Sequence, residues 1–171
     1  ISGFKGTFDG NSDGGASITN LTMTSADNRS GGLFASISEK IENVEVTNAY
    51  IKISTLKNNT RVGGIVASAT SGTPTINNCS FEGTIIVQPD SSVISDENGV
   101  GGIVAEAEDA LVSNCAFSGI IQSEAQATGG IIGLNANTNV TRCENKGTVN
   151  SDRNLGYVGG IVGQDKTSST I

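Results

Sequence analysis

The sequence has no histidine and no tryptophan, and among its 171 residues only 2 are proline and 4% are aromatic. Without histidine the chain cannot build a Ser-His-Asp triad, a Cys-His dyad, a histidine general base or an H-E-x-x-H zinc site. It also contains no P-loop motif, which would carry a Lys followed by Ser or Thr after its glycines. These absences exclude the commonest catalytic arrangements, and we expect no catalytic, cofactor-binding or metal-binding residues.

Charge and long apolar runs are scarce as well. Charged residues make up 16% of the chain, below the roughly 25% of ordinary globular proteins, and the net charge is -7. A negative surface repels phosphate backbones, so we expect no nucleic-acid partner. No apolar run approaches the ~20 residues that span a bilayer, so we expect no membrane insertion.

Glycine is abundant, with 23 residues, and much of it lies in an internal repeat. The string V-G-G-I-V-A and its relatives recur with a period near 30 residues, in repeats that start near residues 31, 62, 100, 128 and 158. The residues after each glycine pair are β-branched or small and predict a strand, whereas a phosphate-binding loop would continue into a helix. We therefore interpret the pairs as points where neighbouring backbones approach closely.

A second motif, an aliphatic residue followed three positions later by another apolar residue, lies between the glycine pairs. Aligning its copies predicts three inward-facing columns. They are Ile18, Ile41, Ile76, Val112 and Val140; Leu21, Val44, Cys79, Cys115 and Cys143; and Met23, Val46, Phe81 and Phe117, interrupted at Asn145. Such columns are typical of stacked parallel strands. They predict an all-β, right-handed parallel β-helix of about five coils, in one domain over residues 1–171.

The two apolar positions of this motif are three residues apart, so a straight strand would place them on opposite faces. We expect a corner between them, formed by an asparagine in the left-handed conformation. The corner residues are Asn20, Asn43, Asn78, Asn114 and, departing from the pattern, Arg142. Stacked asparagine side chains are expected to hydrogen-bond along the axis.

These motifs resemble the GLUG-type repeats of bacterial surface proteins. The stretch F-K-G-T-F-D-G-N from Phe4 to Asn11, then I-T-N-L and G-G-L-F, is similar to the start of such an array, and the V-G-G-I-V-A and N-C-x-F-x-G copies continue it. The resemblance implies a large secreted or wall-anchored parent, often an adhesin. Similar repeats occur in zinc peptidases that cleave immunoglobulin A, but their metal motif lies outside the repeats and is absent from this sequence.

Three groups of residues invite a chemical interpretation that we do not favour. The cysteines share one column, so we expect buried, unreactive free thiols and no bridge or metal site. The segment from Asp9 to Gly14 imitates half of an EF-hand loop, but the position that needs a bidentate Glu is Asn20. The acidic residues Glu106, Glu108 and Asp109 are expected to be solvated turn charges.

The copies differ in length mainly after the second motif, where four segments are expanded, and stacking predicts that the resulting loops line one side of the solenoid. The candidate binding residues on these loops are Lys57, Arg61, Asp90, Asp96, Glu97, Arg153 and Tyr157. A host or extracellular protein, or a glycan, is the expected partner.

The spacing after the last glycine pair makes Ile171 the first inward residue of a further coil. We therefore expect a stretch of a longer array, with targeting and anchor sequences outside it and possible end-to-end self-association through open coil edges. The favoured function is a non-enzymatic structural or adhesion module, extracellular or on the cell surface, without cofactors. Two alternatives stay open at this point: a substrate-positioning domain of a large secreted peptidase, and a carbohydrate-active β-helix enzyme.

Overall fold

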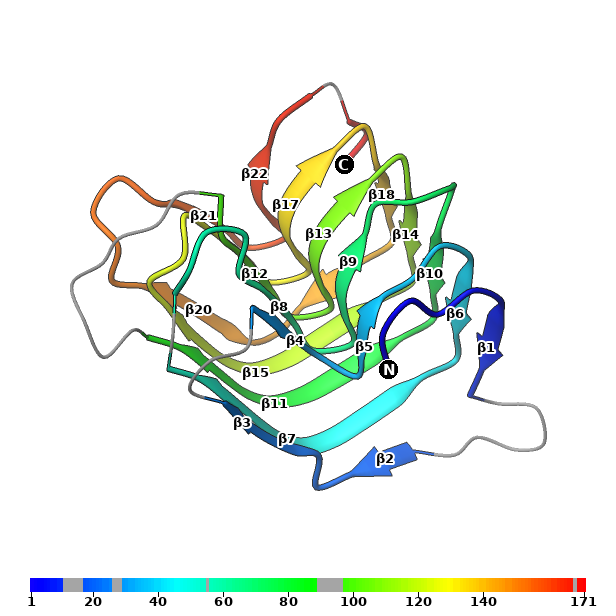
Figure 1. Ribbon diagram of the computed structural model, residues 1–171, viewed down its shortest axis with the longest axis horizontal. Helices are drawn as coiled ribbons and strands as arrows, with labels where there is room; N and C mark the ends of the chain where they lie inside the picture. Colours follow the sequence, from blue (N-terminus) through cyan, green and yellow to red (C-terminus); the bar gives the residue numbers. More distant parts are fainter. Residues whose placement is uncertain (11–16, 26–28, 55, 89–96, 168) are drawn as a thin grey trace.

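A computed structural model describes residues 1–10, 17–25, 29–54, 56–88, 97–167 and 169–171. Across these ranges the chain forms short β-strands and no helix, in the order of a parallel β-solenoid (Figure 1). The strand pairs are parallel, and each strand inside a stack bonds to the equivalent strands of the turn before and the turn after. The all-β parallel solenoid predicted from the repeats is confirmed.

Four stacks of strands make up the walls of the solenoid. The first contains β1 (Thr7–Asp9), β6 (Lys40–Glu42), β10 (Thr75–Asn77), β14 (Leu111–Ser113) and β18 (Asn139–Thr141). The second contains β2 (Ser17–Thr19), β3 (Thr22–Ser25), β7 (Glu45–Ile53), β11 (Ser80–Val87), β15 (Ala116–Ser123), β19 (Glu144–Asn145) and β20 (Thr148–Ser151). The third contains β4 (Ser30–Gly31), β8 (Arg61–Gly63), β12 (Gly99–Gly101), β16 (Ala127–Gly129) and β21 (Tyr157–Gly159). The fourth contains β5 (Phe34–Ser36), β9 (Val66–Ala69), β13 (Val104–Glu108), β17 (Ile132–Ala136) and β22 (Val162–Asp165).

The solenoid has about 4 turns, slightly fewer than the five coils expected. The difference arises because the levels of a solenoid outnumber the full turns between them by one. The first stack, from β1 to β18, holds five strands that succeed one another by one turn each. Five levels are therefore joined by four full turns.

The hydrophobic columns fill the interior as predicted in the later turns, but the first turn is shifted. Phe8, not Ile18, pairs with Ile41 and heads the first column. Ile18 pairs with Val46, and Met23 pairs with Ile51. The predicted placement of Ile18, Leu21 and Met23 beside the start of the second copy was therefore wrong, because the N-terminal copy supplies Phe8 from a separate strand that the motif alignment skipped.

Aromatic side chains contribute to this core in two groups. Phe4, Phe8 and Phe34 pack as a cluster with ring centroids 5.3–6.5 Å apart. Phe81 and Phe117 are stacked one turn apart, with centroids 6.2 Å apart, and both are almost fully buried. At the next level Asn145 pairs with Phe117, which is the break noted in the sequence.

The structure explains that break. The Nδ2 of Asn145 donates to the carbonyl oxygen of Gly160 at 2.8 Å, and its Oδ1 accepts from the N–H of Gly147 at 2.8 Å. Both ends of the amide are therefore bonded to backbone groups, so a polar residue fits where the aromatic column ends.

The asparagine corner is confirmed from the second copy on, but the prediction was wrong for Asn20. Asn20 lies between β2 and β3 at the level of Asn48, whose Nδ2 donates to the Oδ1 of Asn20, so Asn20 is not in the corner column. Asn43, Asn78 and Asn114 have φ angles of 55°, 51° and 54°, in the left-handed region where asparagine is tolerated. The Nδ2 of Asn78 donates to Oδ1 of Asn43 at 2.7 Å, and Nδ2 of Asn43 donates to Oδ1 of Asp9 at 2.8 Å. The ladder along the axis therefore exists. Arg142 adopts the same conformation, with φ 54°, at the position where the pattern departs from asparagine.

One interior side chain offers a test of how strictly this core excludes polar atoms. Thr128 is fully buried between Val100 and Val158, and its hydroxyl has no hydrogen-bond partner among the residues that the structure describes. Thr128→Val keeps the shape and removes an unsatisfied hydroxyl, so we expect the free energy of unfolding in urea to rise by about 1 kcal/mol. Thr60→Val is the matched control, because the equally buried Thr60 hydroxyl donates to the carbonyl of Lys57 at 2.8 Å. The control should lose stability, and a gain in both variants would contradict the explanation.

Candidate functional site

The connections between the second and third stacks lie in a row on one side of the solenoid, at the left of Figure 1. The four that the sequence predicts to be expanded are residues 54–60, 88–98, 124–126 and 152–156, of which 55 and 89–96 lie outside the described part of the chain. We call the described residues of these connections, together with Tyr157, the loop face. The predicted row of loops is therefore present at one corner of each turn.

The predicted binding residues divide into exposed and buried ones. Lys57, Glu97 and Tyr157 are exposed, and Tyr157 retains 48% of its surface. Arg153 is half-buried. Asp90 and Asp96 fall on residues outside the described ranges. The predicted residues thus give the loop face two cations, an acid and an aromatic ring, drawn from three different connections. Glu124, which is half-buried, and Asp152, which is exposed, add two further acids.

Arg61 occupies a different position from the one expected, because it is 7% exposed and fully engaged inside the protein. Its Nε and Nη2 donate to the two carboxylate oxygens of Glu106 at 2.7 and 2.9 Å. Its Nη1 also donates to the carbonyl oxygens of Glu97 and Thr60. A guanidinium with these partners holds the base of the loop face and is not displayed to a ligand.

The same contact corrects the interpretation of Glu106 as a solvated turn charge. Glu106 lies on β13 and its side chain is only 26% exposed, in a two-pronged ion pair with Arg61. The two residues are 45 positions apart, on the third and fourth stacks of different turns. No short motif contains both residues, so no sequence pattern could have predicted this pair.

The bases of neighbouring loops are tied to one another. The N–H of Thr60 donates to Oδ1 of Asn98 at 2.8 Å, and the N–H of Gly99 returns a bond to the carbonyl of Thr60 at 3.0 Å. In the next turn the N–H of Glu97 donates to Oε1 of Gln126 at 2.6 Å. These bonds run along the axis, so the described parts of the loop face are held at fixed spacing by the solenoid.

The cysteines form a column, as expected, and all three are free thiols. Cys79 and Cys115 are buried, whereas Cys143 is half-buried. Each sulfur lies within 3.2–3.4 Å of the carbonyl oxygen two residues before it, which accepts the S–H. The thiols therefore fill space as small apolar groups with backbone acceptors.

Hydrogen bonding within the column alters the acidity of the thiols. Interaction with the neighbouring Cys115 side chain lowers the pKa of Cys143 to about 7, against the opposing effect of burial. The same kind of interaction lowers the pKa of Cys79. The hydrogen bonds to Cys143 and Cys79, together with burial, raise the pKa of Cys115. The expectation of three equally inert thiols therefore gives way to one reactive candidate, Cys143, which is the most accessible.

Thiol labelling tests this difference. We expect one thiol of the folded chain to react with a disulfide reagent, with a half-maximal rate near pH 7, because the lowered pKa of Cys143 yields thiolate at neutral pH. Cys143→Ser should abolish the reaction. Cys115→Ala should move the midpoint up toward about 8.5, the value of a free thiol. Three thiols that react equally in the folded chain would contradict the assignment.

The described residues contain no group of three or more His, Cys, Asp or Glu side chains placed to hold a metal ion. The EF-hand-like segment falls largely on residues 11–16, outside the described part, and the side chain of Asp9 accepts a bond from Asn43 in the corner ladder. Among the described residues the structure has no helix with the length and apolar character to cross a membrane.

The fold and the repeated strand–turn units define the class of this chain as a parallel β-solenoid repeat protein. The GLUG motif matches residues 58–86 and 124–150, so these two stretches are repeats of the GLUG type. The first match runs from the loop before β8 through most of β11, and the second runs from the loop before β16 through most of β20. No curated protein and no solved structure matched the chain.

Proposed function

We propose that this chain is a non-enzymatic structural and adhesion module of a bacterial cell-surface or secreted protein. The observation that carries the proposal is the row of loops on one corner of a solenoid with a continuous apolar core. In solenoids the variable loops gather on one face, which is often the binding face. The core and the axial hydrogen bonds would hold that face rigid, which lowers the entropic cost of binding.

The composition of the loop face supports a protein or glycan partner. Tyr157 is an exposed aromatic ring near charged groups, and aromatic and arginine side chains are the residues that most often dominate binding energy. Lys57 and Arg153 supply positive charge on a chain whose net charge is -7. An extracellular setting agrees with the resemblance of the repeats to those of bacterial surface proteins.

A binding array tests this proposal. The purified chain is applied to immobilised extracellular-matrix glycoproteins, mucins and polysaccharides, and we expect saturable binding to at least one of them. The triple variant Lys57→Ala, Arg153→Ala, Tyr157→Ala should weaken that binding by about tenfold or more. Parallel incubation with the same polysaccharides and proteins should release no cleavage products.

The matched control is the triple variant Tyr50→Ala, Lys146→Ala, Lys166→Ala, which also removes one tyrosine and two cations. Lys52 is kept in this control because it lies beside Ser54 of the loop face. Tyr50, Lys146 and Lys166 lie away from the loop face, on β7, after β19 and after β22, so binding should be unchanged. Equal loss in both triple variants, or no binding to any surface, would overturn the adhesion role. Cleavage of a substrate would overturn the non-enzymatic role.

A further inference from the structure

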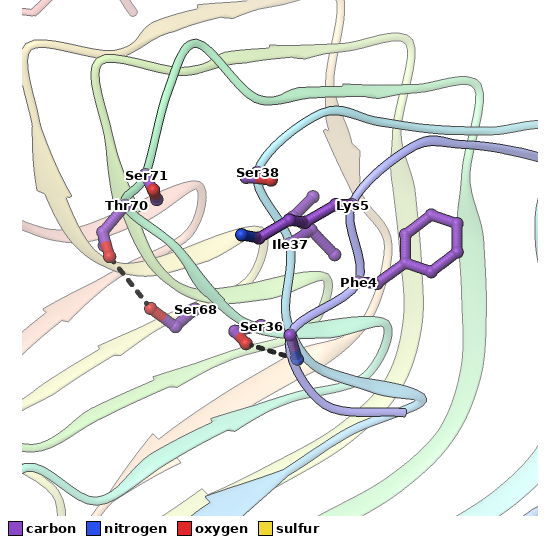
Figure 2. Close-up of a pocket in the computed structure, with 9 residues that line it drawn as sticks. Phe4, Lys5, Ser36, Ile37, Ser38, Ser68, Thr70 and Ser71 are labelled. Carbon is purple, nitrogen blue, oxygen red and sulfur yellow. Dashed lines mark hydrogen bonds between the residues drawn. The ribbon is translucent and has the colours of Figure 1, made fainter.

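A small pocket lies at a different corner of the solenoid, where the fourth stack turns into the first. It has a volume of about 170 Å³ and lies between the N-terminal segment and the ends of β5 and β9 (Figure 2). Its lining consists of Gly3, Phe4, Lys5, Ser36, Ile37, Ser38, Ser68, Thr70 and Ser71. The loop face is built on the connections between the second and third stacks, so the two features are separate.

Five of the nine lining residues carry a hydroxyl, and they differ in how their hydrogen bonds are used. The Ser36 Oγ accepts from the N–H of Gly3 at 2.9 Å, and the hydroxyls of Ser68 and Thr70 share a bond at 3.2 Å (Figure 2). Within the described part of the chain, the hydroxyls of Ser38 and Ser71 have no such partner. Two hydroxyl groups at the pocket wall are therefore ready to bond to a ligand.

The charge of the pocket comes from one lysine. The Lys5 side chain extends across Ile37, with its ammonium group over the pocket, and makes no ion pair among the described residues (Figure 2). No carboxylate belongs to the lining. The strand pairing that joins Ser36 to Ser68 continues to Glu106, whose charge is neutralised by Arg61. The pocket is thus a locally positive site on an acidic protein.

These features select the chemistry of a ligand. An ammonium without a counter-ion attracts a carboxylate or sulfate group, and serine and threonine hydroxyls can both donate to and accept from ligand hydroxyls. Ile37 is only 2% exposed and the ring of Phe4 points away from the pocket, so the pocket offers no stacking platform (Figure 2). The volume is below the roughly 300–1,000 Å³ of pockets for drug-sized molecules, so it suits one small ring.

We propose that this pocket binds a single acidic sugar residue. Its carboxylate or sulfate group pairs with the Lys5 ammonium, and its hydroxyls bond to Ser38, Ser71 and Thr70. This site goes beyond the proposed adhesion role and does not depend on the loop face. The two sources of the anion, a uronic acid and a sulfated sugar, share the same recognition chemistry.

Nuclear magnetic resonance titrations of the full chain test the proposal with four probes: glucuronic acid, glucose 6-sulfate, glucose and inorganic sulfate. We expect saturable shifts of the lining residues with one or both acidic sugars in the millimolar range, and binding of glucose weaker by about tenfold or more. Raising the salt concentration should weaken the binding of the acidic sugars, because screening reduces their attraction to Lys5. Glucose that binds as tightly as both acidic sugars, or the absence of binding by either acidic sugar, would overturn the proposal.

Inorganic sulfate separates sugar recognition from simple anion binding. Sulfate that binds as tightly as the better acidic sugar would show that the hydroxyls recognise no sugar, and would overturn that part of the proposal. The double variant Ser38→Ala, Ser71→Ala should lower the affinity for the acidic sugar by about threefold or more, because two hydroxyl contacts are removed. Unchanged sugar affinity in this variant would likewise contradict the assignment.

Lys5→Ala is expected to lower the affinity for the acidic sugar by about tenfold, because one charge-assisted contact is lost. Lys166→Ala is the matched control, because it removes the same charge from another exposed lysine and should leave binding unchanged. Both variants alter surface residues, and their circular dichroism spectra and melting temperatures should match the parent chain. Equal affinity of Lys5→Ala and the parent chain would overturn the site.

Discussion

Gly102→Ala is expected to lower the free energy of unfolding in urea by about 3 kcal/mol, at the upper end of the usual cost of overpacking. A Cβ at Gly102 would lie 2.5 Å from the ring of Phe117, and closer still to the carbonyl oxygen of Gly130 in the next turn. Neither neighbour can retreat easily, because Phe117 is fully buried and the backbone of the next turn is held by its own strand pairs. Gly64→Ala should behave alike, since its Cβ would lie 2.6 Å from the ring of Phe81.

Gly160→Ala provides the matched control within the same motif. It is the second glycine of the last pair, and a Cβ there would meet no atom of the described residues within 4 Å. Neither Gly102 nor Gly160 has a positive φ angle, so backbone strain does not distinguish them. We expect Gly160→Ala to change stability by no more than about 0.5 kcal/mol. Equal losses at both glycines would show that close approach to the aromatic column is not the cause.

Glu106→Ala is expected to cost about 3 kcal/mol of unfolding free energy, because it leaves the buried Arg61 guanidinium without its counter-charge. The effect should also loosen the loop face, since Arg61 donates to the carbonyl of Glu97 at the base of one loop. Hydrogen exchange at the amides of Glu97 and Gly99 should therefore accelerate by more than the global loss of stability explains. Unchanged exchange at these amides would contradict the role of Arg61 as an anchor.

Two further variants serve as controls for Glu106→Ala. Glu144→Ala removes a carboxylate from an exposed pair with Lys146, 2.9 Å long, and should cost no more than about 1 kcal/mol. The double variant Arg61→Met, Glu106→Leu removes both buried charges and should recover at least half of the stability lost in Glu106→Ala. A double variant less stable than Glu106→Ala would indicate that the ion pair contributes net stability beyond avoiding an unpaired charge.

The repeat allowed much of the core to be predicted without coordinates. In a parallel solenoid an inward residue stacks on equivalent residues one turn above and below, so the same residue types recur at the repeat period. Ile41, Ile76, Val112 and Val140 are paired in this way, and the alignment of their motifs found them. The left-handed corner followed from the asparagines at fixed positions.

The first turn shows where this argument fails. Phe8 and Ile18 are both apolar residues in short strands, and each could head the first column. Pairing decided in favour of Phe8, because β1 bonds to β6 while β2 bonds to β7. The N-terminal glycine pair is displaced as well, since Gly31 pairs with Val62 and not with Gly63. A single divergent copy lacks the neighbours on both sides that fix the register elsewhere.

The sequence by itself determined the architecture of this protein: the parallel solenoid, its interior columns and the corner at which its loops gather. It could do so because stacking repeats the same local environment in every turn, and repeated environments leave repeated residues. Only the tertiary structure decided which polar residues are used internally and which are free. Arg61 and Glu106 meet across 45 positions, and Lys5, Ser38 and Ser71 line one pocket from successive turns. Each of these arrangements occurs once, so it leaves no period in the sequence, and only the folded chain brings its members together.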